Sequence, residues 1–149
     1  MNPIAEFTYD YRFLSNFWPS DFVSPTVEHR FQAAKVTDTI WSVKIMEAKT
    51  PGEAKRLGKD AARCGQVRQN WDQVKESVML DLIRQKFKQA DLRAKLLATG
   101  DAMLVEGNNW HDTYWGVCHC VNHQGEGLNK LGRILMQVRE ESRPSTVIV

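Results

Sequence analysis

The sequence predicts an α+β fold, a mostly helical single domain with a small sheet of short strands. Residues that favour helix N-caps repeatedly precede amphipathic runs, which indicates several helices. Extended pieces are short and are expected in the N-terminal region, in the stretch before residue 110 and, weakly, at residues 147–149. Because the 149 residues contain no internal repeat and no linker-like change in composition, one domain is expected over residues 1–149.

Local signals place the elements in the first half of the chain. Residues 1–24 are interpreted as short extended pieces and turns. A helix is expected to begin after Thr26, which is a favoured N-cap residue, and a second helix is expected at about residues 38–49. The segment Thr50-Pro51-Gly52-Glu53 combines a capping box with proline at the first helical position, so it predicts a third helix.

Asn70 is expected to cap the longest helix of the chain. Apolar residues recur along this segment at helical spacing, while lysines and glutamines occupy its other side. The buried side of the helix is therefore expected to consist of Trp71, Val74, Val78, Leu82 and Phe87.

Further elements are predicted towards the C-terminus. A short helix at residues 91–99 is expected to end at Gly100, and residues 102–105 are expected to form a short buried strand. Residues 142–149 are interpreted as a poorly ordered tail or, at residues 147–149, as a weak strand. A last amphipathic helix is indicated by Leu128, Leu131, Ile134, Leu135 and Val138.

Composition restricts the classes of function. The net charge of +2, from 20 basic and 18 acidic residues, does not require a nucleic-acid partner. No apolar run approaches the roughly 20 residues of a membrane span, and the first residues lack the layout of a signal peptide. Cys64, Cys118 and Cys120 form an odd set that predicts no disulfide framework, which favours a cytoplasmic location.

The segment Trp110–Gly116 is the first candidate for an active site. It contains three large aromatic residues, a histidine and Asp112, and it shows neither helical nor alternating apolar periodicity. Aromatic faces beside an acid suit a flat, electron-poor substrate. The alternative is a loop whose tryptophans simply fill the core.

A second candidate lies on the predicted helix after Thr26. Glu28, Gln32 and Lys35 share one helical face, which is too polar to be ordinary core. A glutamate and a lysine two turns apart, about 10 Å along the axis, suit a substrate bound between them. The alternative is that Glu28 only stabilises the start of its helix.

Ser15, Asn16 and Phe17 form a third unusual group, in which a polar pair adjoins an aromatic ring. Such a group suits hydrogen bonding to a ribose or base while the ring stacks on the base. The alternative is a hydrophobic plug with Asn16 serving a turn. Trp71, at the start of its helix, is either core or the wall of a pocket.

The run Cys118-His119-Cys120-Val121-Asn122-His123 contains ligand types that bind zinc. Structural zinc sites usually pair cysteines two to four residues apart and need four ligands. Here the C-x-C spacing is shorter, and the remaining ligands would have to come from His111, His123 or Cys64. No metal is therefore expected, and the run is interpreted as a loop with incidental polar residues.

These candidates belong to a longer series of motifs that resembles the NADAR family of YbiA-like N-glycosidases. The resemblance runs from about residue 7 to 140, and the motifs occur in the family's order. The motifs are Phe13-Leu14-Ser15-Asn16-Phe17, Glu28-His29 with Gln32-Ala33-Ala34-Lys35, Ala54-Lys55-x-Leu57-Gly58, Trp71, Lys86-Phe87-x-Gln89, Leu96-Leu97-x-Thr99-Gly100, Asp112-x-x-Trp115-Gly116 and Gly127-x-Asn129-x-Leu131-Gly132-x-x-Leu135-Met136-x-x-Arg139.

The resemblance implies an N-glycosidase. Family members cleave phosphorylated ribosylamino-pyrimidine intermediates of riboflavin synthesis or remove ADP-ribose from modified guanine bases. ADP-ribosylated guanine, in nucleic acid or nucleotides, is the first expected substrate. The alternatives are the riboflavin intermediates and a non-catalytic ADP-ribose-binding module. The family usually has a glycine-containing stretch where this chain has Val117-Cys118-His119-Cys120, so substrate preference at this loop is an open question.

The chemistry requires help at both ends of the C–N bond. Glu28 and Asp112 are the expected carboxylate pair, and Lys35 is expected to act as nucleophile or as electrostatic anchor. No cofactor, no metal and no obligate protein partner is expected. Substrate-binding positions are expected at Ser15, Asn16, Phe17, Gln32, Trp71, Trp115, Gly116 and Asn129.

Overall fold

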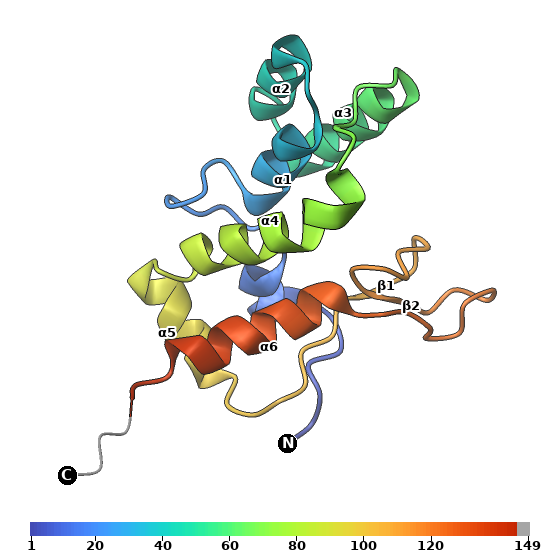
Figure 1. The fold of residues 1–149 in the computed structure, drawn as a ribbon. Helices are drawn as coiled ribbons and strands as arrows, with labels where there is room; N and C mark the ends of the chain where they lie inside the picture. Colours follow the sequence, from blue (N-terminus) through green and yellow to red (C-terminus); the bar gives the residue numbers. More distant parts are fainter. Residues whose placement is uncertain (146–149) are drawn as a thin grey trace. The chain divides into compact units, whose positions relative to one another are not determined.

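The computed structural model describes residues 1–145, so the expected weak strand at residues 147–149 lies outside the described residues. This part of the chain contains one 3-10 helix, six α-helices and one two-stranded sheet (Figure 1). None of its helices is both long and apolar enough to cross a membrane. The expected mostly helical α+β architecture with a small sheet is confirmed.

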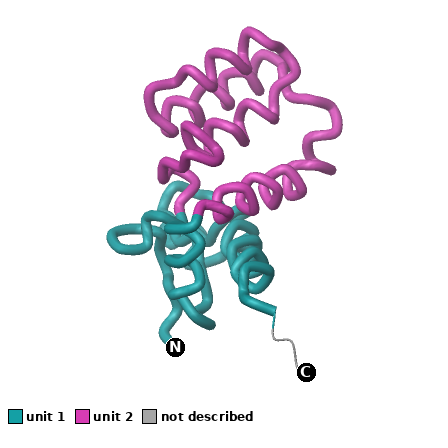
Figure 2. Tube along the Cα trace, turned by 90° about the vertical axis from the view of Figure 1, so that its left-hand side faces the viewer, with its two compact units in different colours: residues 1–14, 90–149 teal, residues 15–89 magenta. Residues whose placement is uncertain are grey.

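The chain divides into two compact units (Figure 2). One unit consists of residues 15–89, and the other consists of residues 1–14 together with the chain from residue 90 onward. The expectation of one domain over residues 1–149 stays a prediction.

The unit of residues 15–89 is entirely helical apart from its connections. Helix α1 packs against each of the other three helices, and the second helix also packs against the third. A core cluster of Val36, Ile45, Ala54 and Ala61 lies among them. The helices are α1 (Val27–Lys35), α2 (Thr39–Met46), α3 (Pro51–Arg63) and α4 (Trp71–Lys86).

Side-chain caps begin the first three helices, and two of them, Thr26 and Thr50, were predicted from the sequence. Thr26, Asp38 and Thr50 each accept hydrogen bonds from backbone N–H groups in the first turn that follows. The capping box of α3 differs in one detail, because Glu53 Oε2 accepts from the backbone N–H of Lys49 at 3.0 Å. These local hydrogen bonds explain why the starts of the helices were predictable.

Helix α4 corrects two expectations. The Asn70 side chain makes no cap hydrogen bond, because its Oδ1 accepts from Arg68 Nε at 2.9 Å instead. The buried side of the helix is also rotated from the expected one, since Val74, Val78 and Leu82 are only partly buried. The residues that are buried are Trp71, Met79, Ile83, Lys86 and, at the C-cap, Phe87.

The other unit combines helices with the small sheet. Helix α5 packs against α6, and the two strands are parallel, with Gly107 beside Val117 and Asn108 beside Cys118. Gly100 follows α5 with a φ of 63°, a left-handed conformation that suits glycine after a helix. The elements are the 3-10 helix η1 (Tyr9–Leu14), α5 (Ala90–Ala98), β1 (Gly107–Asn108), β2 (Val117–Cys118) and α6 (Lys130–Ser142).

Two expectations in this unit are wrong, namely that residues 1–24 consist of short extended pieces and turns and that residues 102–105 form a strand. Residues 9–14 form η1, in which the adjacent Phe13 and Leu14 are both buried. A strand would place these two side chains on opposite faces, so a helical turn buries them better. Residues 102–105 make only a single bridge between Leu104 and Ile4, because one N-terminal residue pairs with them.

Helix α6 has the expected buried stripe with one exception. Leu128 precedes the helix and is exposed. The buried members of the stripe are Leu131, Ile134, Leu135 and Val138.

Candidate active site

Helix α1 carries the polar face that the sequence predicted. Glu28 and Gln32 follow one another along one side of this helix, and both are buried, with 7 % and 8 % of their surface exposed. Gln32 Nε2 donates a hydrogen bond to Glu28 Oε1 at 2.8 Å. The Glu28 carboxylate is therefore oriented by a neighbour from its own helix, one turn away.

Lys35 is half-buried at the C-terminal end of α1. Burial lowers the pKa of its ammonium group, the carboxylate of Glu28 raises it, and the positive charges of Lys59 and Lys75 lower it. The net result is a pKa below the ordinary value of 10.5. A lower pKa increases the fraction of neutral amine, which is the form that acts as a nucleophile.

The segment Ser15–Phe17 is held by hydrogen bonds to two helices of its unit. The Asn16 carbonyl accepts from the backbone N–H of Glu28 at 3.1 Å, at the start of α1. Lys86 Nζ, near the end of α4, donates to the Ser15 carbonyl at 2.8 Å. The side chain of Asn16 is buried, with Nδ2 3.6 Å from Met79 Sδ. These contacts bring the third candidate group next to Glu28.

Two buried acceptor atoms in this unit have no hydrogen-bond partner, Asn16 Oδ1 and Gln32 Oε1. An unpaired buried carbonyl costs about 1–3 kcal/mol, so such atoms need an explanation. Gly58 of α3 leaves the space that the Gln32 amide occupies, because a Cβ at this glycine would overlap Gln32 Oε1. Both oxygens are closed to solvent, so the protein itself packs around them.

The aromatic residues predicted in this unit differ in exposure. Trp71 is 8 % exposed, and its ring lies 5.0 Å from that of Phe31 at an angle of 52°. Most of its surface is therefore used in packing. Phe17 is 42 % exposed and offers a ring face to a ligand.

The segment Trp110–Gly116 is irregular, as expected, and Asn108 organises it. Asn108 is buried, and its Nδ2 donates to the carbonyls of Asp112 at 2.8 Å and Val117 at 3.0 Å. Its Oδ1 accepts from the backbone N–H groups of Trp110 and Asp112. One amide side chain thus replaces the regular backbone pairing that the segment lacks.

The Asp112 carboxylate is itself part of the loop. Asp112 Oδ1 accepts from the backbone N–H of Tyr114 at 3.1 Å and from that of Trp115 at 2.9 Å. Asp112 is partly exposed. One carboxylate oxygen therefore holds the turn that presents Trp115, in addition to any role in catalysis.

Trp115 is partly exposed and stands edge-on to Tyr114, with ring centroids 5.0 Å apart. The alternative in which the tryptophans of this segment fill the core is wrong for Trp110, whose side chain is 58 % exposed. Gly116 is buried, and a Cβ there would overlap the carbonyl oxygen of Glu106. Glycine is needed at this position because two backbone segments approach closely.

Asn129, predicted to bind sugar or phosphate, uses both ends of its amide within the protein. Its Nδ2 donates to the Leu104 carbonyl at 2.9 Å, and its Oδ1 accepts from the Glu106 N–H at 3.0 Å. Its φ of 51° is left-handed, which asparagine tolerates better than most residues. These contacts give Asn129 a role in joining the start of α6 to residues 104–106.

The predicted site residues fall into both compact units. Asp112, Trp115, Gly116 and Asn129 belong to the unit that contains the sheet. The unit of residues 15–89 brings together Ser15, Asn16, Phe17, Glu28, Gln32, Lys35 and Trp71.

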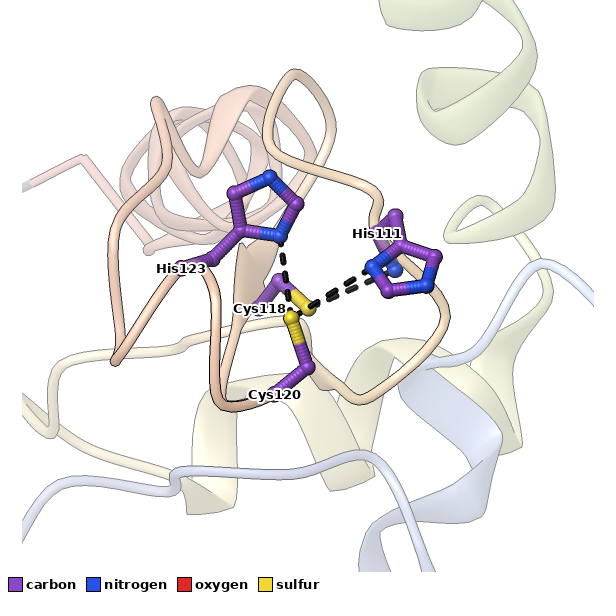
Figure 3. A group of neighbouring side chains, drawn as sticks. All are labelled: His111, Cys118, Cys120 and His123. Carbon is purple, nitrogen blue, oxygen red and sulfur yellow. Dashed lines mark hydrogen bonds between the residues drawn. The ribbon is translucent and has the colours of Figure 1, made fainter.

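The fold also brings together four possible metal ligands. The donor atoms of His111, Cys118, Cys120 and His123 all lie within 4.8 Å of one another (Figure 3). Cys64, the other cysteine, is exposed in the other unit. From the C-x-C spacing alone, this run was interpreted as a loop with incidental polar residues. The fold places both His111 and His123 beside the two cysteines.

Two residues near the candidate groups were not singled out by the sequence analysis. Lys86 was assigned to the solvent-facing lysines of its helix, but it is wholly buried. Its place in the motif Lys86-Phe87-x-Gln89 was the available signal. Asn108 carried no signal, because its role depends on carbonyl groups that only the folded loop brings near it.

Known proteins resemble this chain both in sequence and in fold. The sequence matches the NADAR domain family over residues 5–143. N-glycosidase YbiA of Escherichia coli is 43 % identical over 138 residues, which cover 89 % of this chain and 82 % of the relative. The NMR structure of E. coli YbiA has a TM-score of 0.76 at 40 % identity, covering 95 % of this chain and 86 % of that one.

A further relative is named as a protein of riboflavin biosynthesis. Riboflavin biosynthesis protein VVA0006 of Vibrio vulnificus is 37 % identical over 135 residues, which cover 87 % of this chain and 35 % of the relative. The N-glycosidase class expected from the sequence is confirmed by the similarity to YbiA. With a match over nearly all its length and relatives above 40 % identity, the chain belongs to the NADAR family.

Proposed function

We propose that this enzyme hydrolyses the bond between the anomeric carbon of a ribose and a base nitrogen, with Lys35 and Glu28 as its principal catalytic groups. The observation that carries the proposal is one face of α1. There a lysine with a lowered pKa lies on the same side as a buried glutamate. A binding module has little use for this combination, because burying charged groups costs free energy.

The neutral Lys35 amine attacks the anomeric carbon. As the new C–N bond forms, the bond to the base breaks, and its electron pair and a proton pass to the departing base nitrogen. The ribose ring then opens to give a Schiff base. Water adds to the same carbon and releases the amine, so the net reaction consumes one water and yields the free sugar and the free base.

Glu28 has two tasks in this scheme. Its charge stabilises the positive character that develops on the ribose, and its carboxylate takes up and returns protons. Asp112 is proposed as the second carboxylate of the reaction. In the alternative route, Lys35 serves as an electrostatic anchor, and a carboxylate activates a water that attacks directly.

The polar and aromatic neighbours are proposed to bind the substrate. Asn16 and Gln32 are proposed to contact the ribose, and Gln32 also orients Glu28 through a hydrogen bond. Phe17 and Trp115 are proposed to stack on the base or on an adenine.

Two substrate classes are proposed for this site. ADP-ribosylated guanine, in nucleic acid or nucleotides, is the first, and it rests on the family resemblance alone. A phosphorylated ribosylamino-pyrimidine is the second, and the similarity to a riboflavin biosynthesis protein of Vibrio vulnificus supports it.

A paired assay tests the proposal. The protein is incubated with a guanine-ADP-ribosylated oligonucleotide and, separately, with the ribosylamino-pyrimidine phosphate, and base release is followed. Base release from one of them, lost in Lys35→Met and kept in the solvent-side variant Lys44→Met, supports the proposal and identifies the substrate class. Inactivity on both, together with micromolar binding of ADP-ribose, would identify a binding module instead.

A further inference from the structure

We propose that His111, Cys118, Cys120 and His123 bind one zinc ion, which holds the aromatic segment Trp110–Gly116 in place. The donor atoms of the four side chains lie within 4.8 Å of one another and point towards a common centre (Figure 3). All four belong to the unit that contains the sheet. The proposal is independent of the proposed reaction, because no step of that reaction uses a metal.

The distances between the donors suit tetrahedral zinc. Zn–S bonds of about 2.3 Å and Zn–N bonds of about 2.0–2.1 Å separate the ligand atoms by roughly 3.3–3.8 Å. Cys120 Sγ lies 3.1 Å from His123 Nδ1 and 3.4 Å from His111 Nδ1. These separations are already close to the tetrahedral values, so small side-chain movements complete the site.

The chemistry of the donors selects the ion. Two thiolates and two neutral imidazoles are soft to intermediate ligands that favour zinc over magnesium or calcium. Two thiolates neutralise the two charges of the ion, which lowers the cost of placing it beside the buried Cys118. Four protein ligands leave no open position for water, so the site is structural rather than catalytic.

A backbone donor already faces one of the two sulfur ligands. The backbone N–H of His111 lies 3.3 Å from Cys118 Sγ. Such a hydrogen bond orients a ligand sulfur and supports it when a metal binds.

Backbone hydrogen bonds position the ligands before any metal binds. Cys118 lies in β2, and its N–H donates to the Glu126 carbonyl at 2.9 Å. A turn then brings His123 back to Cys120, with the His123 N–H donating to the Cys120 carbonyl at 3.2 Å. His111 has a φ of 71°, a left-handed conformation that is uncommon outside glycine but that histidine adopts more often than most residues. The site therefore links three stretches of the loop, at residues 111, 118–120 and 123.

The place of the site in the sequence indicates its purpose. His111 lies inside the aromatic segment next to Asp112, and Cys118 follows two residues after Gly116, so the ligands enclose residues 112–117. An ion bound to both ends would restrict the segment, which has no regular backbone pairing of its own. The chain thus replaces secondary structure with a metal cross-link.

The test is a metal titration of the full-length protein, kept reduced. Co²⁺, a spectroscopic stand-in for Zn²⁺, is expected to bind one per chain with the visible bands of a tetrahedral site and a thiolate charge-transfer band. Zn²⁺ is expected to displace it and to raise the melting temperature. Cys120→Ser and His123→Ala change partly exposed side chains. Each is expected to lower the affinity for Zn²⁺ more than about 100-fold. Loss of a residue that only hydrogen-bonds to a metal ligand costs less than this.

Two matched controls complete the experiment. His119→Ala removes an exposed histidine from the same loop, and Cys64→Ser removes the exposed cysteine of the other unit. Both are expected to bind Co²⁺ and Zn²⁺ as the unaltered protein does. An octahedral Co²⁺ spectrum, unchanged binding in Cys120→Ser, or equal loss in His119→Ala would each overturn the proposal.

Discussion

Gln32 Nε2 donates a hydrogen bond to Glu28 Oε1 at 2.8 Å, while the other end of the same amide is buried without a partner. One side chain therefore orients the proposed catalytic carboxylate through Nε2 and packs its own oxygen against α3. The arrangement depends on the absence of a side chain at Gly58, where a Cβ would overlap Gln32 Oε1.

Gly58→Ala is expected to reduce base release by about 10- to 100-fold, because the added methyl group displaces Gln32 and with it Glu28. Overpacking of this kind costs about 1–3 kcal/mol in the free energy of unfolding. The measurements are kcat/KM for base release and chemical denaturation of the same variant.

Gly52→Ala is the matched control for this change, because it lies in the same helix and its Cβ meets only Thr50 Oγ1, at 3.9 Å. It is expected to keep full activity and to unfold at slightly higher denaturant concentration, since alanine favours helices over glycine by about 1 kcal/mol. Full activity of Gly58→Ala would show that Gln32 does not position Glu28.

The pH profile of kcat/KM is expected to rise towards high pH, with a limb below 10.5 that reports Lys35. The sign follows from the nucleophilic role, since only the neutral amine attacks the anomeric carbon. Lys59→Gln removes a positive charge that lowers the pKa of Lys35, so the limb should move to higher pH.

Lys44→Gln, at a position that does not contribute to the lowered pKa of Lys35, is expected to leave the limb unchanged. If Lys35 acts as a charged anchor, activity will instead fall as the pH rises through the same range. The direction of the limb therefore distinguishes the two roles of Lys35.

Borohydride added during turnover is expected to trap the sugar on Lys35, because reduction converts the Schiff base into a stable amine. Mass spectrometry of proteolytic fragments should locate the adduct in the fragment that contains Lys35. Lys35→Arg should give no adduct and no turnover, whereas Lys59→Arg should give both. An active Lys35→Arg that yields no adduct would rule out the covalent route.

Asp112 is expected to show different effects in two substitutions. Asp112→Asn keeps an oxygen that accepts from Tyr114 N and Trp115 N, so it should fold normally and lose about 10²- to 10⁴-fold in rate if the carboxylate moves protons. Asp112→Ala should also lose about 0.5–1.5 kcal/mol of stability per hydrogen bond removed. Thermal unfolding and base release are measured on both, and an active Asp112→Asn would reduce Asp112 to a structural residue.

Local hydrogen bonding made much of the fold predictable. Thr26, Asp38 and Thr50 each cap a helix within three residues of themselves, and Gly100 ends α5 in the conformation that glycine favours. The polar face of α1 was predictable for the same reason, because helical spacing alone puts residues 28, 32 and 35 on one side.

The failed predictions share a cause. A hydrogen-bond partner or a packing surface that the local pattern does not reveal decides the conformation instead. Arg68 takes the oxygen with which Asn70 would have capped α4. Residues 102–105 form no regular strand because only Ile4 pairs with them. Periodicity alone does not decide how a helix is rotated against its neighbours, so the buried side of α4 differs from the expected one.

The sequence by itself determined the family, the starts of α1, α2 and α3 and the choice of candidate catalytic residues, since these depend on residue type and short spacing. Only the tertiary structure decided that Lys86 is buried against Ser15, that oxygens of Asn16 and Gln32 lack partners, and that His111 and His123 meet Cys118 and Cys120. Each of these depends on how segments far apart in the chain, or on either side of an irregular loop, pack together. Local propensity carries no information about such contacts, because their free energy arises only once the polar groups lose their water and meet each other.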